Sequence, residues 1–315
     1  MVISLPGQPG EAAFHDALAR AMEATIGAGE GRAKPGSVRA IILAYFQSAD
    51  FKLLRASSAS VTRRILESFC KQHGDKPLAL MQPAHVRSIL DKMSGTPHAA
   101  NNLLKKLRVA CRWAIARALL TSDPTSGVKP LRVRSEGFKN WSESDIAQFE
   151  AAHPSGTRAR LAFALLLYTG QRRGDVVKIG RQHAKDGALV LTQEKTGRRL
   201  SIPIVEPLRQ ELEGPAAGPM TYLVTHTGAP FSGPGFTNWF RECVRAANLP
   251  AGLSAHGLRK AASRRLAEAG CTPHQIAAIT GHATLGEVER YTRASDQARL
   301  AISAAPALLR RNENE

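Results

Sequence analysis

The sequence predicts a mixed, mainly α-helical protein with an all-helical first domain and a second domain that adds a small antiparallel sheet. Two observations indicate the elements: apolar residues recur with helical spacing before residue 120, and two short apolar runs after residue 187 resemble paired strands. A third observation separates the domains, because proline, glycine and basic residues interrupt the pattern between residues 123 and 140. A chain of 315 residues is long enough for two cores.

The first domain is expected to span residues 34–126, followed by a linker at 127–140. Residues 1–33 are rich in Gly, Ala and Glu and have no assigned fold, although residues 11–25 could form a helix. Within the domain, apolar residues repeat with helical spacing in four segments, at 38–47, 60–73, 83–93 and 97–120.

The second domain is expected to span residues 141–296, followed by a tail at 297–315. The tail carries apolar side chains, which we expect to be buried against another protein surface. Its strands are predicted at 188–193 and 199–204, so Lys195 falls where a hairpin turn belongs. A helix should begin near His256, and Thr284 with Glu287 has the spacing of a capping box that opens a short helix. Tyr291 would lie on that helix.

The charge of the chain indicates a nucleic-acid partner. The formal net charge is +17 and the isoelectric point about 10.3, which creates a field that attracts polyanions. Residues 37–135 hold 17 Lys and Arg against 5 Asp and Glu, a net charge of +12. We interpret one helix there as a DNA-contact surface, with asparagine and arginine suited to base edges and lysine to phosphates, the alternative being a solvated charged face. Its polar residues are Asn101, Asn102, Lys105, Lys106, Arg108 and Arg112.

Other classes of partner and site find little support in the sequence. The longest apolar run, residues 161–168, is far short of the ~20 residues that a membrane-spanning helix needs, and the amino terminus lacks a signal-peptide pattern. We therefore expect a cytoplasmic, nucleoid-associated protein without a membrane partner. The four cysteines are widely spaced and the histidines have no metal-ligand spacing, so no metal and no cofactor are expected.

Candidate catalytic residues occur in the second domain in the order Arg172, Lys195, His256, Arg259, His282, Tyr291. Two guanidinium groups suit a phosphodiester, because each offers a planar fork of donors to the phosphate oxygens. A tyrosine, with a pKa near ~10, attacks phosphorus only if a neighbour accepts its proton or cations stabilise the phenolate. A lysine on an exposed turn could protonate the leaving 5′ oxygen.

His256 and Arg259 stand three residues apart at the start of a predicted helix and therefore share a face. The amino end of a helix also favours an anion such as phosphate. Taken singly, each candidate has a structural interpretation as a solvated charge or a core residue. The conjunction of six residues in order, each in a suitable local context, favours the catalytic interpretation.

In the segments LLLYTGQRRGDVV, TQEKTGRRLSIPI, SAHGLRKAASRRLAEAG and ITGHATLGEVERYTRA, the chain resembles the tyrosine recombinase (phage integrase) family. The resemblance implies a SAM-like helical core-binding domain that grips DNA opposite the catalytic domain. It implies that Arg172 and Arg259 clamp the phosphate, Lys195 is the general acid, His256 and His282 assist proton transfer, and Tyr291 is the covalent nucleophile. Asp175 matches an acidic position that helps to hold Arg172, whereas Lys260 departs from the second histidine of many relatives.

The resemblance also implies the partners of the protein. These are double-stranded DNA with specific recombination sites and accessory DNA-bending or directionality proteins. On the DNA the protein would form dimers and tetramers, in which the tail is exchanged between protomers. The implied activity is integration or excision of a mobile element through a 3′-phosphotyrosyl intermediate. Three alternatives remain open. They are a type IB topoisomerase, which uses nearly the same residues, a DNA-binding regulator with an inactive site, and a metal-dependent nuclease.

Overall fold

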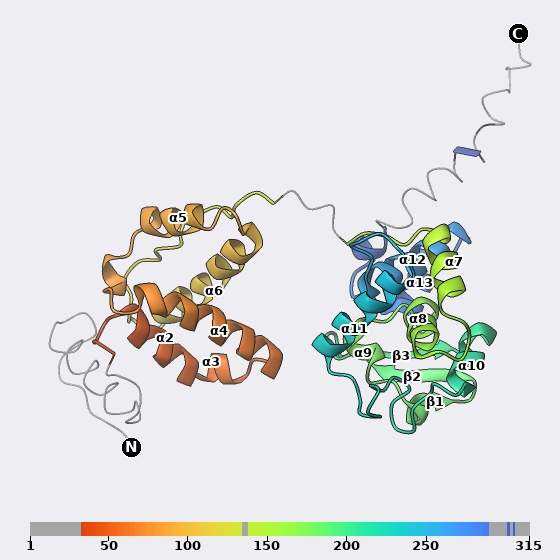
Figure 1. Cartoon of the computed structure of the whole chain (residues 1–315). Coiled ribbons are helices and arrows are strands. Elements are labelled where there is room, and N and C mark those ends of the chain that lie inside the picture. The colour runs from red at the N-terminus through yellow and green to blue at the C-terminus, as the bar shows by residue number, and fades with distance from the viewer. Residues whose placement is uncertain (1–32, 134–137, 290–300, 303–304, 306–315) are drawn as a thin grey trace, which may run out of the picture. The chain divides into compact units, whose positions relative to one another are not determined.

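The computed structural model describes residues 33–133, 138–289, 301–302 and 305, and divides into two compact units at residues 1–135 and 136–315 (Figure 1). In the described ranges the first unit is helical, and the second combines helices with a three-stranded antiparallel sheet. The predicted fold class, mixed and mainly helical, is confirmed.

The first unit is built on three long helices that pack against each other around an aromatic cluster. Tyr45 lies edge-on to Phe51 and Trp113, with ring centroids 5.4 and 5.5 Å apart, an arrangement that adds to the effect of burying the rings. The side chain of Ser37 caps the first helix by accepting a hydrogen bond from the Ala40 amide at 3.2 Å. The helices are α2 (Val38–Gln47), α3 (Ala49–Lys52), α4 (Ala56–His73), the 3₁₀ turn η1 (Leu78–Leu80), α5 (Pro83–Lys92) and α6 (Pro97–Ile115).

The last predicted helix of this unit, residues 97–120, is shorter in the structure because α6 ends at Ile115. Ala118 has a φ of 55°, in the left-handed region that a helix interior excludes. The chain turns there, and the Leu119 amide bonds to the Ala114 carbonyl at 2.9 Å. Helix α4 is longer than predicted, because it begins at Ala56 and the predicted start was residue 60.

Part of the stretch expected to be a linker, residues 127–140, packs against the two units. Val128 is 3% exposed and joins Val86 and Leu104 in a small core between α5 and α6, with Leu131 packed against it. At the other end, Trp141 is fully buried in the core of the second unit. An apolar side chain within a Pro- and Gly-containing stretch thus still packs into a neighbouring core, and Trp141 lies in the second unit, where the second domain was expected to begin; the bounds of the linker stay a prediction.

The second unit is organised around one buried helix, α8 (Arg158–Thr169), which packs against α12 (Ala255–Glu268) and α10 (Glu206–Glu213). Its other helices are α7 (Glu143–Ala152), α9 (Arg173–Val176), the 3₁₀ turn η2 (Arg181–His183), α11 (Gly233–Ala246) and α13 (Pro273–Thr280). Residues 285–289 begin a further helical turn.

The sheet of the second unit has the order β1 (Ala184–Lys185), β2 (Ala188–Thr192) and β3 (Arg199–Pro203), all antiparallel. Leu189 faces Ile202 and Leu191 faces Leu200, and these four side chains are buried while their neighbours point outwards. This alternation agrees with the predicted hairpin, whereas the short strand β1 was not predicted. The register places the turn of the hairpin, and hence Lys195, beyond the sheet.

Within the described residues, none of the helices combines the length and the apolar character needed to cross a bilayer. The cysteines have no disulfide partners; Cys70, Cys111 and Cys243 are buried, and burial raises the pKa of the Cys111 thiol to about 12.

Candidate active site

The position of Arg172 is set by the turn that ends α8. Gly170 terminates the helix with a φ of 60°, and a Cβ atom there would come within 2.9 Å of the Thr280 methyl group. Only glycine combines that conformation with so close an approach. Arg172 then forms the N-cap position of α9, and its Nη1 donates a hydrogen bond to Oε1 of Gln193 at 3.0 Å. The turn therefore directs Arg172 towards the end of β2.

Gln193 and Gln171, both fully buried, form a pair that sequence reasoning did not identify. The Nε2 atom of Gln193 donates to Oε1 of Gln171 at 2.6 Å and to the Thr280 carbonyl at 2.9 Å. Its Oε1 accepts from Arg172 and, at 2.7 Å, from the Thr196 hydroxyl. All four hydrogen-bonding positions of the Gln193 amide are thus filled, as burial requires. The only signal in the sequence was a glutamine beside Arg172 and another two residues before Lys195.

Lys195 is exposed at the hairpin turn, as predicted. Behind it, the carboxylate of Asp175, which is 7% exposed, accepts a hydrogen bond from the Glu194 amide at 2.8 Å. Asp175 was expected to hold Arg172, but in the described part of the chain Gln193 is the side chain that bonds to the Arg172 guanidinium. The structure instead makes Asp175 the anchor of the turn that carries Lys195.

Arg259 lies in the first turns of α12 and is 2% exposed. Its Nη1 donates to the Gly170 carbonyl at 2.7 Å and to the Thr280 carbonyl at 2.6 Å. Those two carbonyls stand at the ends of α8 and α13. A buried guanidinium needs such partners, and Arg259 therefore fixes both helix ends around itself.

His282 follows the end of α13 and is 7% exposed. Its Nδ1 lies 2.7 Å from the Thr280 hydroxyl, whose own proton is donated to the Ile276 carbonyl at 2.7 Å. The hydroxyl must then accept from Nδ1–H, which leaves Nε2 of the neutral imidazole as an acceptor. Burial, together with the charges of Arg259, Arg172 and His256, lowers the pKa of His282 to about 3. His282 is therefore neutral at physiological pH.

His256 is the second residue of α12, and its side chain is exposed. Burial by the surrounding protein nevertheless lowers its pKa, and the positive charges of Arg259, Lys260, Arg172 and Lys195 lower it further. Residues from the end of α8, the hairpin and the first turns of α12 therefore act on one imidazole. The structure thus brings five of the six predicted catalytic residues into one basic cluster. They are Arg172, Lys195, His256, Arg259 and His282.

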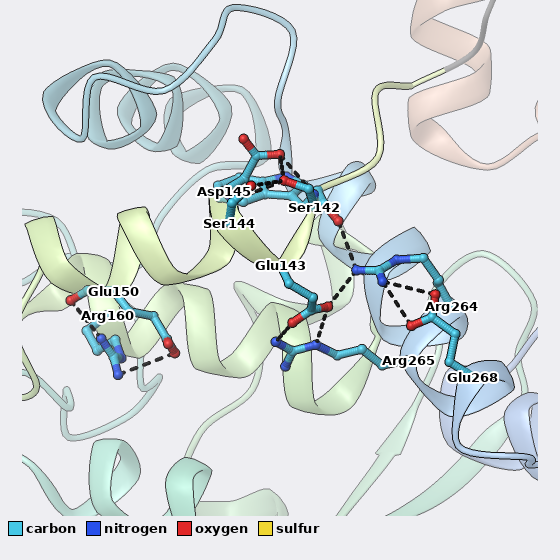
Figure 2. A network of polar contacts seen from close by, with 10 residues as sticks. Ser142, Glu143, Ser144, Asp145, Glu150, Arg160, Arg264, Arg265 and Glu268 are labelled. Carbon is cyan, nitrogen blue, oxygen red and sulfur yellow. Dashed lines mark hydrogen bonds and ion pairs between the residues drawn. The ribbon is translucent and has the colours of Figure 1, made fainter.

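A second network links α12 to the start of α7 (Figure 2). Glu143, in the first turn of α7, accepts from Nη2 of Arg264 at 2.6 Å and from Nε of Arg265 at 3.0 Å. The hydrogen bond from Arg265 is the main reason that the pKa of Glu143 falls to about 2, with Arg264 contributing. Arg264 also bonds to the Trp141 carbonyl at 3.1 Å. The catalytic-site helix is thus tied to the start of the second unit.

Residues 142–298 match the phage integrase family. The chain belongs to this family. The integrase of Escherichia phage HK022 is 29% identical over 132 residues, which cover 41% of this chain and 37% of the relative. The integrase of Escherichia phage lambda is 27% identical over 131 residues, with the same shares covered. The chain thus matches little more than a third of the length of these curated relatives.

Solved structures of integrases share the fold. A lambda integrase dimer bound to a COC′ core site has a TM-score of 0.73 and 19% identity, covering 81% of this chain and 95% of that one. A Tn1549 transposon integrase in complex with circular intermediate DNA has a TM-score of 0.69 and 17% identity, covering 84% of this chain and 98% of that one. The chain therefore shares its fold with these integrases over most of its length.

Tyr291, which the family resemblance makes the nucleophile, lies outside the described residues, as does most of the tail at 297–315. The helical turn at 285–289 leads towards Tyr291, and its Val288 is fully buried against Ala267, Ile276 and Ala277. The Glu287 amide bonds to the Thr284 carbonyl at 3.3 Å. This turn is therefore docked on α12, which carries His256 and Arg259, and on α13, which ends two residues before His282.

The predicted DNA-contact residues of α6 divide into two groups. Asn102, Lys105 and Arg112 are exposed, and Lys106 is partly buried. Their role in DNA contact stays a prediction.

Asn101 and Arg108 instead hold the segment that follows α6. Oδ1 of Asn101 accepts from the Leu131 amide at 2.7 Å, and its Nδ2 donates to the Leu131 carbonyl at 2.8 Å. Arg108 donates to the Val128 carbonyl. The interpretation of Asn101 as a reader of base edges is therefore corrected, because both ends of its amide are occupied by backbone.

Proposed function

We propose that this protein is a site-specific tyrosine recombinase, an integrase that cleaves and rejoins double-stranded DNA to integrate or excise a mobile element. One observation carries the proposal: Arg172, Arg259, Lys195, His256 and His282, from separate segments, converge on one basic cluster. A site of this kind, with cations and neutral imidazoles but no carboxylate among the five, suits the charge that develops on a phosphodiester in its transition state.

Each residue of the cluster has a role that its environment supports. Arg172 is held by Gln193, and Arg259 by the carbonyls of Gly170 and Thr280, so the orientation of both guanidinium groups is fixed before a phosphate binds. The neutral imidazoles, His256 and His282, accept or relay a proton. Lys195, on its anchored turn, is placed to protonate a leaving oxygen.

In the proposed reaction the Tyr291 hydroxyl passes its proton to a neutral imidazole of the cluster, and its oxygen attacks the scissile phosphorus. The bond from phosphorus to the 5′ oxygen breaks, and Lys195 supplies the proton for that oxygen. The product is a 3′-phosphotyrosyl bond and a free 5′ hydroxyl. A 5′ hydroxyl of another strand then attacks the phosphotyrosyl bond and releases Tyr291. One phosphoester replaces another at each step, so the exchange is close to isoenergetic.

The proposed partner is double-stranded DNA that carries specific sites, bound by dimers and tetramers of the chain. Residues 37–135 carry a net charge of +12, which supports a large electrostatic contribution to binding. Among the neighbours, a lambda integrase dimer is solved on a core site and a tetramer on a Holliday junction. We extend these assemblies to this chain as part of the proposal.

The decisive experiment traps the covalent intermediate. Nicked duplexes with the ends of the host element are incubated with the protein in EDTA and resolved on a denaturing gel. We expect a covalent protein–DNA band that Tyr291→Phe abolishes without loss of DNA binding and that the matched control Tyr168→Phe retains. A band that persists in Tyr291→Phe would mean that the nucleophile is another residue.

Two further outcomes separate the alternatives. DNA that is shifted but never trapped, on a substrate known to contain the correct site, would indicate a DNA-binding regulator. Relaxation of a supercoiled plasmid that lacks any such site would indicate a topoisomerase.

A further inference from the structure

An aromatic side chain at the start of the second unit contacts one of the catalytic-site histidines. Phe138 is 55% exposed, yet its ring centroid lies 4.4 Å from that of His256, with 54° between the planes. Its carbonyl accepts a hydrogen bond from Nζ of Lys260 at 2.7 Å. Lys260 is the position at which the sequence departs from many relatives, and this bond gives it a structural partner.

The backbone around Phe138 is fixed on the first turn of α12. A Cβ atom at Gly257 would lie 2.4 Å from the Lys139 carbonyl and 2.9 Å from Cδ1 of Trp141, so only glycine admits this crossing. Nε1 of the buried Trp141 donates to the Ser254 carbonyl at 3.0 Å. Residues 138–141 therefore lie across the amino end of the helix that carries His256 and Arg259.

We propose that Phe138 and Lys260 are positioning residues for His256, an inference that rests on the proposed recombinase function. The Phe138 ring covers part of the imidazole and limits its rotation, while Lys260 holds the Phe138 backbone. A side chain that already occupies the reactive rotamer loses less entropy when the phosphate arrives. Neither residue needs to touch the DNA for this role.

The same contact influences the protonation of His256. Water is excluded from the part of the imidazole that Phe138 covers, which disfavours the charged form. The charged groups that lower the pKa of His256 are Arg259 and Lys260 on α12, Arg172 before α9, and Lys195 on the hairpin. The remaining titratable neighbour, His282 after α13, is itself neutral at physiological pH. The four cations therefore each favour a neutral imidazole. Loss of the Phe138 ring removes only the effect of burial.

The first test measures the titration of His256 by NMR of the full-length protein in the absence of DNA. We expect Phe138→Ser to raise the pKa of His256, and Phe138→Tyr, which keeps the ring, to leave it unchanged. Met220→Ser serves as the control, because Met220 is 75% exposed in the same unit and has no ring contact with His256. An unchanged His256 titration in Phe138→Ser, or an equal shift in the control, would overturn the proposal.

Lys260 is tested by separating its charge from its hydrogen bond. Lys260→Met loses both, whereas Lys260→Gln loses the charge but retains an N–H donor for the Phe138 carbonyl. Both variants should raise the pKa of His256, because a neighbouring positive charge is lost, and the methionine variant should raise it further. Equal shifts in the two variants would show that Lys260 acts on His256 by its charge alone and not through this bond.

The second readout is the pH profile of covalent adduct formation on the nicked substrate. In Phe138→Ser the acidic limb should move to higher pH, with a several-fold loss of rate at about pH 6 and a smaller loss at about pH 8. An equal loss at every pH would contradict the proposed control of His256 protonation. A native protein that forms no adduct would refute the recombinase function. The NMR titration of His256 without DNA does not depend on that function, and it therefore tests the contact between Phe138 and His256 by itself.

Discussion

Gln193 bonds to Arg172 through its side-chain oxygen, 3.0 Å from Nη1 of the arginine. The nitrogen of the same amide donates to the backbone carbonyl of Thr280. The side-chain hydroxyl of Thr280 in turn contacts Nδ1 of His282. One buried side chain therefore joins Arg172, the hairpin of Lys195 and the segment that carries His282. Displacement of Gln193 should disturb three catalytic-site residues at once.

We predict that Gln193→Leu impairs cleavage more than DNA binding. The variant leaves the Gln171 amide and the Thr280 carbonyl each without one partner, which should lower the free energy of unfolding by about 1–3 kcal/mol. Single-turnover assays measure cleavage, filter binding measures the affinity for DNA, and denaturant unfolding measures stability. Gln182→Leu, at an exposed glutamine of the same unit, should change neither. Equal cleavage rates in the two variants would contradict the role assigned to Gln193.

Gly281→Ala should destabilise the site by two mechanisms. Gly281 has a φ of 69°, and a Cβ atom there would lie 2.4 Å from Nε2 of Gln193. Gly187→Ala is a matched control, because Gly187 has a φ of 74° but nothing within 4 Å of its Cβ position. Both variants carry the backbone strain, of about 1–2 kcal/mol. Only Gly281→Ala should also slow cleavage, and a similar loss of activity in the control would count against the clash.

His282 should make stability fall in mild acid. Its folded-state pKa of about 3 lies below the unfolded value of ~6.5, so between these pH values the unfolded chain binds the extra proton. The free energy of unfolding should therefore decrease by about 1.4 kcal/mol per pH unit from this group as pH falls below ~6.5, and level off near the folded pKa.

The His282 contribution can be isolated by measuring unfolding against pH in His282→Asn. The variant should have a shallower slope between about pH 6 and pH 4 than the native chain, whatever its stability at neutral pH. His226→Asn, at an exposed histidine, is the control. A native slope in His282→Asn would show that the buried histidine does not titrate as proposed.

Two polar residues of α6, Arg112 and Asn101, should respond in different ways to substitution. Arg112→Gln removes an exposed charge and should weaken DNA binding for all sequences, with the slope of log affinity against log salt reduced by about one. Asn101→Ala should leave that slope unchanged and instead lower stability by about 1–3 kcal/mol, because the amide and carbonyl of Leu131 lose their partners. Filter binding across a salt series and thermal unfolding distinguish them. A reduced salt slope in Asn101→Ala would restore its role at the DNA.

The local patterns of the sequence predicted α2, α4, α5, α6, α12 and the hairpin, but most helices of the second unit were not assigned from the sequence. Helical spacing is a property of short segments, so α2, α5 and the hairpin of β2 and β3 were recognisable without knowledge of their partners. The end of α6 was not, because it depends on the left-handed Ala118. Nor was the burial of Val128, because it depends on surfaces of α5 and α6 that are distant in the sequence.

The sequence by itself determined the order and type of the reactive residues, from Arg172 to Tyr291, and the positive charge that favours DNA. Which side chains hold that site was decided only by the tertiary structure. Gln171 with Gln193, Asp175 with the Glu194 amide, and Phe138 with His256 are contacts between segments far apart in the chain. Hydrogen bonds and packing act over a few ångströms in space, and no spacing along the sequence specifies which groups meet.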